Sequence, residues 1–341
     1  MKNILTTKVS IIYFVFLTSI AVFCTFLITA SYFKLHKSKS SFTAGVEDLK
    51  SSNSCNNIQF KRLNGYTLIK PLLFADKSCE SGAFSSLKQS VEGIINTYKV
   101  AGDLSTASVY VRDFNEGDFM DINSEEKFKL GTLMKIPVLV SYLRDEEDNP
   151  GSFEKELQIS SNEKLKHSLH ENKMQVGRKY KIKQLLELMM INDDENATQL
   201  LYENINLKAF KKTFSDIGIP EPVSCSDSIS ISAANYSLFM RTLYNATYLT
   251  INDSEYAIEL LVKSNATQNI YKDLSTSTRI AHKSSAEETV EGKVQNETSI
   301  IYLKDTPYLI TIMTKGKDND KLSKAISKIS AAVYNEMAYK S

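Results

Sequence analysis

The chain has strand patterns at both ends of its folded part and helix patterns between them, and this order constrains the fold more than any other feature. Residues 107–114 alternate in period two, residues 115–118 are typical of a turn, and residues 119–122 return as a second strand. Further strands are predicted near the C-terminus, at 279–283, 299–303 and 308–314.

Helical spacing of apolar residues flanks these strands and fills the middle of the chain. Residues 83–100 and 321–339 each place apolar side chains along one side. Residues 150–250 are mainly helical in pattern, apart from a predicted loop at 219–232. These patterns together predict an α+β fold, in which terminal helices flank an antiparallel sheet and an all-helical domain is inserted.

An uncharged apolar segment precedes the folded part and runs from Val9 to Phe33. About 20 apolar residues span a bilayer core, whereas a cleaved signal peptide has an apolar region of about 7–15 residues. We therefore expect a transmembrane signal anchor at 9–33, a short cytoplasmic N-terminus at 1–8 and a linker with a pre-domain segment at 34–82. A cleaved signal peptide and a buried hairpin in a soluble protein are the alternatives.

The cysteines favour a location of the main domain outside the cytoplasm. Cys55 and Cys79 flank one segment and could close a loop, which would require an oxidising compartment, although two unpaired thiols are also possible. His167 and His170 lie in a Lys-rich stretch that is typical of a solvated loop, so we expect no metal site and no cofactor. Lys plus Arg exceed Asp plus Glu by only one, which gives no reason to expect a nucleic-acid partner.

Thr132 and Lys135 are the first candidates for chemistry, because they open a predicted helical segment at 133–143. At that spacing a hydroxyl near the positive end of a helix lies one turn from an amine. Such an amine can take the proton of the hydroxyl if burial lowers its own pKa. Thr is also an ordinary helix cap, so a purely structural role is the alternative.

Three blocks of sequence resemble the class A β-lactamases and penicillin-binding proteins. Residues 107–117 and 128–139 resemble the hairpin and the Ser-x-x-Lys helix of that family. Residues 176–197 resemble the approach to its Ser-Asp-Asn motif, and residues 280–286 resemble its Lys-Thr-Gly strand. The blocks occur in the family's order over about residues 85–340.

The resemblance implies a domain organisation and a site. A β-lactamase-like domain would occupy 83–341, with an α/β part at 83–145 and 250–341 and a helical part at 146–249. By position, Thr132 would be the nucleophile, Lys135 its base and Asp193 the relay group. Substrate binding would fall to five residues: Glu195, Lys283, Ser284, Ser285 and Ala286. The backbone N–H groups of Thr132 and Ala286 would form the oxyanion hole.

The motifs depart from the family at several positions. Thr132 replaces Ser, Asp193-Asp194-Glu195 replaces Ser-Asp-Asn, and Lys283-Ser284-Ser285 replaces Lys-Thr-Gly. A carboxylate at Asp193 favours the charged form of Lys135, and a carboxylate at Glu195 can only accept hydrogen bonds. We therefore expect structural ion pairs between Lys135 and Asp193, and between Lys283 and Glu195, as the alternative to catalysis.

Four further residues carry smaller expectations. Ser285 adds a side chain where a substrate would pair with the strand, Asp194 is expected to be structural, and His282 is expected to pack or to form a hydrogen bond. Glu221 lies in the loop where class A enzymes hold the Glu that activates the deacylating water, but its neighbours at 222–225 do not match that motif.

Two functions from different classes remain open. The first is a membrane-anchored hydrolase that acts on β-lactams or peptidoglycan peptides through an acyl intermediate on Thr132. The second is a non-catalytic relative that binds or scaffolds at the cell wall. In both, the partners expected are a β-lactam or peptidoglycan peptide and the membrane, through residues 9–33.

Overall fold

The computed structural model describes residues 58–63, 68, 71–159, 174–226, 228–264, 278–304 and 306–340. The predicted anchor at 9–33, most of the linker, Cys55 and the pair His167 and His170 lie outside these residues. Within the described ranges, no helix has both the length and the apolar character needed to cross a membrane.

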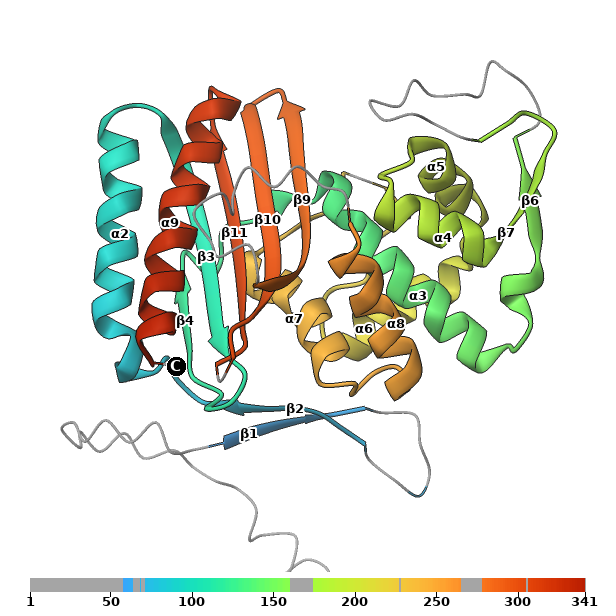
Figure 1. The fold of residues 1–341 in the computed structure, drawn as a ribbon, viewed down its shortest axis with the longest axis horizontal. Helices are drawn as coiled ribbons and strands as arrows, with labels where there is room; N and C mark the ends of the chain where they lie inside the picture. The colour runs from blue at the N-terminus through green and yellow to red at the C-terminus, as the bar shows by residue number, and fades with distance from the viewer. Residues whose placement is uncertain are drawn as a thin grey trace, which may run out of the picture. The chain divides into compact units, whose positions relative to one another are not determined.

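A five-stranded antiparallel sheet forms one half of the folded part, in the order β4-β3-β11-β10-β9 (Figure 1). Its strands are β3 (Leu104–Asp113), β4 (Phe119–Ile122), β9 (Arg279–Thr289), β10 (Gly292–Tyr302) and β11 (Tyr308–Gly316). The predicted hairpin of β3 and β4 is confirmed, and the three late strands are present but longer than their apolar cores suggested. Strand β9, which carries Lys283, lies at the edge of the sheet.

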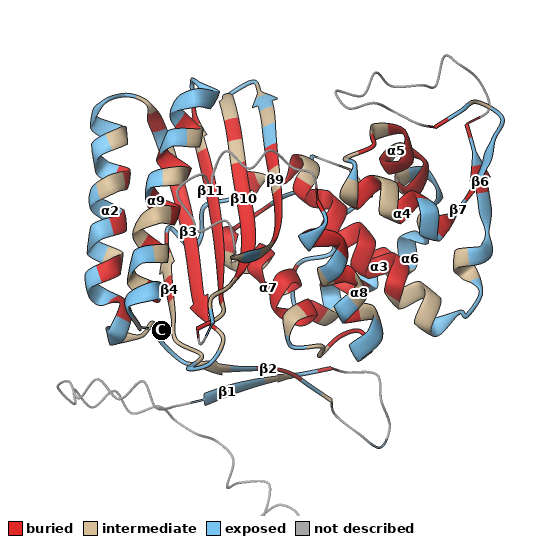
Figure 2. Cartoon of the chain, viewed as in Figure 1, coloured by how far each residue is buried: buried red, intermediate tan, exposed pale blue. Residues whose placement is uncertain are grey.

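Two helices, α2 (Ser85–Val100) and α9 (Asn319–Lys340), cover one face of the sheet (Figures 1 and 2). Both were predicted as amphipathic helices. The apolar stripe of α9 is fully buried, and it consists of Leu322, Ile326, Ile329, Val333 and Met337. Burial of each such side chain contributes roughly 1.5–3 kcal/mol, so packing rather than helix propensity holds these helices on the sheet.

The other face of the sheet packs against a helical half. Its helices are α3 (Lys135–Asp148), α4 (Ile182–Ile191), α5 (Glu195–Asn204), α6 (Leu207–Ile217), α7 (Ala233–Tyr244) and α8 (Ile251–Val262). Helix α3 is buried along most of its length and contacts the other five, while α7 and α8 also contact the sheet. This half also contains two small antiparallel sheets of two strands each. In one, β5 (Phe128–Lys129) pairs with β8 (Ser230–Ile231), and in the other β6 (Glu156–Gln158) pairs with β7 (Lys179–Lys181).

A separate hairpin of β1 (Ile58–Arg62) and β2 (Leu72–Lys77) precedes the sheet and contacts both halves. Asp76 forms an ion pair with Arg112 of β3 at 3.0 Å and another with Arg241 of α7. The Lys61 ammonium donates to the carbonyl of Ile217 at the end of α6. The segment predicted only as a pre-domain region therefore holds a structural element.

Cys79 follows this hairpin and is disulfide-bonded. Cys225 forms no disulfide, so the partner of Cys79 lies outside the described residues. A disulfide is typical of proteins in an oxidising compartment.

Asp121 on β4 gives a pH-dependent stability prediction. Burial, reinforced by Glu80, raises the pKa of Asp121 to about 6. Its Oδ1 atom has no hydrogen-bond partner among the described residues. A raised folded pKa means that the group favours folding below its unfolded pKa of about 3.9, and that this contribution is lost as the pH rises through about 6.

We therefore expect Asp121→Asn to stabilise the protein at pH 8 by roughly 1–2 kcal/mol, a figure reduced for the partial exposure of the group. The gain should vanish near pH 4, where the wild-type carboxyl is already neutral. Thermal unfolding of both proteins at the two pH values measures this. An equal gain at both would show that charge burial is not the cause.

Candidate functional site

Thr132 lies in a single 3₁₀ turn, η2 (Gly131–Met134), which leads directly into α3. The predicted helical segment is therefore present, but Lys135 rather than Thr132 is the first residue of its α-helical part. Thr132 is half-buried, and its hydroxyl makes no hydrogen bond to any described residue. A hydroxyl activated by a base would be expected to bond to that base.

Asp193 lies in the turn between α4 and α5. Helix α4 ends at Ile191, and Asp193 takes the left-handed conformation with φ +55°, which Asp tolerates better than most residues. Asp194 then caps α5, because its side chain accepts from the N–H groups of Asn196 and Ala197, both at 2.9 Å. Asp194 is buried and structural, as predicted.

One oxygen of Asp193 accepts hydrogen bonds from two buried lysines. Lys135 Nζ lies 2.9 Å from Asp193 Oδ1, and Lys283 Nζ bonds to the same atom. The side chains of Lys135 and Lys283 are 2% and 0% exposed, whereas that of Asp193 is 20% exposed. The three predicted motifs therefore meet at one point, and the predicted pair of Lys135 with Asp193 is present.

Lys283 is held by further acceptors. Its ammonium donates to the carbonyl of Met190 at 3.1 Å and lies 3.5 Å from the hydroxyl of Ser264. Met190 is in the last turn of α4, where carbonyl groups lack partners within the helix and favour a cation. The sequence analysis missed both acceptors, because a backbone carbonyl and an isolated Ser leave no pattern in a sequence.

The electrostatics of the cluster follow from burial and pairing. Burial lowers the pKa of Lys283 to about 8, against the opposing effect of Asp193. Burial also acts to raise the pKa of Asp193, but the ammonium groups of Lys283 and Lys135 outweigh it, so its pKa lies below its usual range. Asp193 is therefore ionised at neutral pH and serves as the counter-ion of both lysines.

The expected pair of Lys283 with Glu195 is wrong. Glu195 is half-buried at the start of α5 and makes no ion pair with a described residue. Asp193 is closer than Glu195 to the end of α4, where Lys283 donates to the carbonyl of Met190. At that position one carboxylate accepts hydrogen bonds from both lysines. No hydrogen bond or ion pair joins the Glu195 carboxylate to Lys135 or Lys283.

The β9 residues after Lys283 divide between two environments. Ser284 is half-buried and Ala286 is exposed, whereas Ser285 is buried and its hydroxyl has no partner among the described residues. A Cβ built on Gly131 would lie 2.4 Å from Ser285 Oγ. The Ser285 side chain thus faces the Gly131 turn, and its expected crowding of a substrate that pairs with the strand stays a prediction.

Glu287 reaches the same place and was not singled out from the sequence. A Cβ on Gly131 would lie 2.3 Å from Glu287 Oε1, so only glycine fits there, and the φ of +51° at Gly131 also favours glycine. The period-two alternation of β9 could have indicated this residue, since Lys283, Ser285 and Glu287 share one face of the strand.

His282 lies on the opposite face of β9 and is buried, as predicted. Its Nδ1 atom is 3.4 Å from Glu297 Oε1 on the neighbouring strand. Glu297 also accepts from the hydroxyl of Ser299 at 2.9 Å. The charge of Glu297 also reaches the Asp193 cluster, because it acts to raise the pKa of Lys283 against the larger effect of burial.

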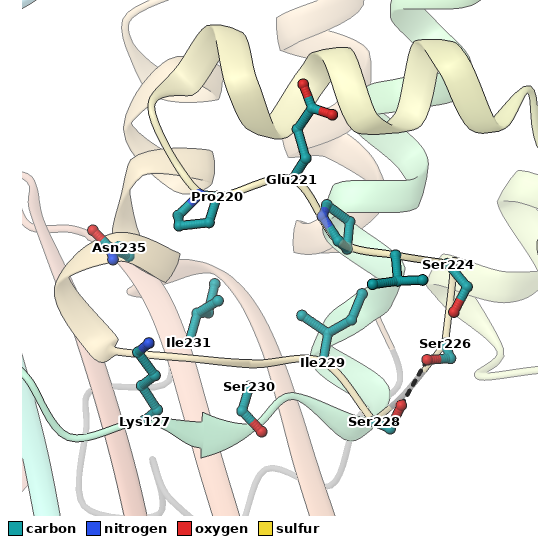
Figure 3. Close-up of a pocket in the computed structure, with 12 residues that line it drawn as sticks. Lys127, Pro220, Glu221, Ser224, Ser226, Ser228, Ile229, Ser230, Ile231 and Asn235 are labelled. Carbon is teal, nitrogen blue, oxygen red and sulfur yellow. Dashed lines mark hydrogen bonds between the residues drawn. The ribbon is translucent and has the colours of Figure 1, made fainter.

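Glu221, the candidate for a water-activating residue, lines a cavity of about 330 Å³ (Figure 3). Its carboxylate points away from the other lining side chains, among them Pro220 and Ile231. Thr132, Lys135, Asp193 and Lys283 do not line this cavity. The arrangement does not bring Glu221 to the cluster. Among the described residues, no group of His, Cys, Asp and Glu side chains could hold a metal ion.

Comparison with known proteins places these observations in a family. Residues 86–337 match the family model described as the beta-lactamase enzyme family. Among curated proteins, none matches this sequence significantly.

Three solved structures illustrate the similarity of fold. PBP-A has 17% identity and a TM-score of 0.63, over 75% of this chain and 96% of that protein. The TLA-1 extended spectrum β-lactamase has 15% identity and a TM-score of 0.65, over 74% and 99% of the two chains. A β-lactamase from Chitinophaga pinensis has 14% identity and a TM-score of 0.64, over 74% and 99%.

Proposed function

Because the chain belongs to the beta-lactamase enzyme family, we propose that it is a member that binds cell-wall peptides at the outer face of the cell membrane without forming an acyl-enzyme. A variant of PBP-A has been captured as an acyl-enzyme complex with penicillin G, which is the chemistry that this chain would have to repeat in order to be catalytic. The bond of Lys135 to Asp193, described above, is the observation that carries the proposal.

A general base must accept a proton from its nucleophile. Lys135 donates a hydrogen bond to the Asp193 carboxylate, which also accepts from Lys283, so its amine acts as a donor there and is not placed to accept a proton from Thr132. The hydroxyl of Thr132 bonds to neither lysine. Residues of one catalytic unit act together, so the loss of the base and of the relay removes most of the rate enhancement.

The location at the membrane rests on the predicted anchor at 9–33 and on the disulfide of Cys79. The disulfide supports an oxidising compartment, and the length of the apolar segment supports an anchor that remains attached. The ligand class rests on the family alone, whose structurally similar members include β-lactamases.

Incubation of the detergent-solubilised full chain with labelled benzylpenicillin tests the catalytic part of this proposal. We expect no covalent mass adduct between pH 6 and pH 10. A stoichiometric adduct that peptide mapping places on Thr132 would overturn the proposal in favour of an acylating hydrolase.

Cosedimentation with purified, insoluble peptidoglycan tests the binding part. We expect the full chain to pellet with peptidoglycan and to remain in solution with cellulose, which controls for trapping in a polymer mesh. Equal recovery in the two pellets would contradict wall-peptide binding.

A further inference from the structure

We propose that the outward face of the β1–β2 hairpin is a second membrane contact, through which the folded part lies against the lipid bilayer. The partner is a bilayer surface rather than another protein. This inference rests on the membrane location in the proposed function and goes beyond it, because it names the surface of the folded part that meets the lipid.

The inward face of the hairpin is held to the rest of the fold. Asp76 forms the two ion pairs with arginines described above, and the Arg241 guanidinium lies 4.4 Å from the centroid of the buried Phe74 ring. Lys61 stands opposite Phe74 and points the same way, since its ammonium donates to the carbonyl of Ile217. These contacts fix which side of the hairpin faces away from the fold.

The outward face is apolar and exposed. Phe60 stands opposite Ala75, and Ile58 lies two residues earlier on the same face. Ile58 and Phe60 are 55% and 60% exposed, Leu72 at the start of β2 is 41% exposed, and Leu68 in the connection between the strands is 94% exposed (Figure 2).

This concentration of exposed apolar side chains is unusual for the molecule. Among the described residues, eleven large apolar side chains are exposed, and four of them lie in this hairpin. A contiguous exposed apolar surface of this kind marks a site of interaction with a membrane or another molecule.

The charges of the hairpin favour a lipid surface. Strands β1 and β2 contain three basic side chains and one acid, Asp76, which gives a net charge of +2. The acid faces inward to its arginines, so no carboxylate of these strands stands on the outward face. Apolar area and basic charge together are what binds a protein surface to a bilayer that contains anionic lipids.

The position of the hairpin in the chain selects the membrane as its partner. The predicted anchor ends at Phe33, and the 24 residues at 34–57 separate it from Ile58. A segment of that length spans at most about 80 Å, so the anchor would keep the hairpin close to the bilayer. Such a tether gives an effective concentration in the millimolar range, at which even a weak contact is populated.

The area of the patch is too small for a stable protein partner. Four partly exposed apolar side chains amount to at most a few hundred Å², whereas stable interfaces bury roughly 800 Å² on each side. A contact of this size cannot hold a free partner, but it suffices for a surface to which the chain is already anchored.

A single introduced tryptophan tests the proposal, because the chain contains no Trp of its own. The full chain with Phe60→Trp is reconstituted in vesicles of phosphatidylcholine and phosphatidylglycerol whose acyl chains are brominated. Bromine quenches a Trp that reaches the acyl chains. We expect the emission to fall about twofold relative to unbrominated vesicles of the same composition.

Val290→Trp is the matched control. Val290 is also exposed, and it lies in the turn between β9 and β10, at the opposite end of the sheet from Arg112, which contacts the hairpin. Its emission should be the same in brominated and unbrominated vesicles.

Ile58→Ser in the Phe60→Trp background should weaken the quenching, because it removes an apolar group from the outward face. Gln59→Ser in the same background should leave the quenching unchanged, since Gln59 stands opposite Asp76 on the inward face. Equal effects of the two substitutions would contradict the assignment of the face.

Equal emission of Phe60→Trp in the two kinds of vesicle would overturn the inference, as would equal quenching at positions 60 and 290. Unquenched emission that shifts to shorter wavelength as the density of protein in the vesicles rises would indicate a second copy on this face, and would also overturn it.

Flotation of the wild-type chain with the same vesicles tests the anchor separately. A chain that fails to float would end the membrane location in the proposed function, and this inference with it. A chain that floats while Phe60→Trp stays unquenched would end this inference alone.

Discussion

Asp193→Ala is expected to destabilise the protein by about 3–5 kcal/mol, because it leaves two buried ammonium groups without their counter-ion. For a folded part of this size, the loss corresponds to a fall of roughly 10 °C in the melting temperature. Thermal or denaturant unfolding of the full chain measures it. The expected cost comes from unpaired charge, which exceeds what the loss of one hydrogen bond would produce.

Glu195→Ala is the matched control. Glu195 is a half-buried carboxylate two residues away and makes no ion pair with a described residue. Its favourable position in the first turn of α5 contributes at most about 1 kcal/mol. Equal losses in the two variants would contradict the assignment of Asp193 as the shared counter-ion.

A compensated variant checks the cause. If unpaired charge is responsible, Lys135→Met and Lys283→Met added to Asp193→Ala should recover most of the lost stability, since burying apolar groups of similar length costs less than burying a charge.

The pH dependence of this loss has a definite sign. The pKa of Asp193 lies below its ordinary value in the folded protein, so its contribution to stability is present above the unfolded pKa of about 3.9 and is lost as the pH falls through the folded pKa. The difference between the wild type and Asp193→Ala should therefore persist from neutral pH down to about pH 4 and shrink only below it.

The triple variant Thr132→Ser, Asp193→Ser and Glu195→Asn is expected to gain acylation by labelled benzylpenicillin, from no adduct to a stoichiometric one. A neutral hydroxyl at 193 removes the anion to which both lysines donate, and a buried amine that lacks a counter-ion gives up its proton more readily and can then act as a base. Intact mass and peptide mapping would locate the adduct at position 132.

Thr132→Ser alone is the matched control and should remain inert, because Asp193 still holds both lysines. The triple variant needs a parallel unfolding measurement, since the loss of Asp193 costs stability. A folded triple variant that takes up no label would contradict Asp193 as the principal block, and would direct attention to Glu287 and Ser285 on the Gly131 turn.

The sequence by itself determined the layers of this fold and the meeting of its motifs. Period-two alternation at 107–114 and the apolar stripe of 321–339 predicted a strand and a helix because local spacing decides which face a side chain occupies. The order of the Thr-Lys, Asp-Asp-Glu and Lys-Ser-Ser segments predicted one site, and Asp193 does join Lys135 to Lys283.

Only the tertiary structure decided which groups pair within that site. Lys283 bonds to Asp193 and to the carbonyl of Met190 rather than to Glu195, because the end of α4 presents both acceptors at one point in space. Glu287 reaches Gly131 because β9 runs past the turn before α3, a contact between residues more than 150 positions apart. Spacing along a chain cannot specify such pairings, since they depend on how helices and strands from distant segments pack against one another.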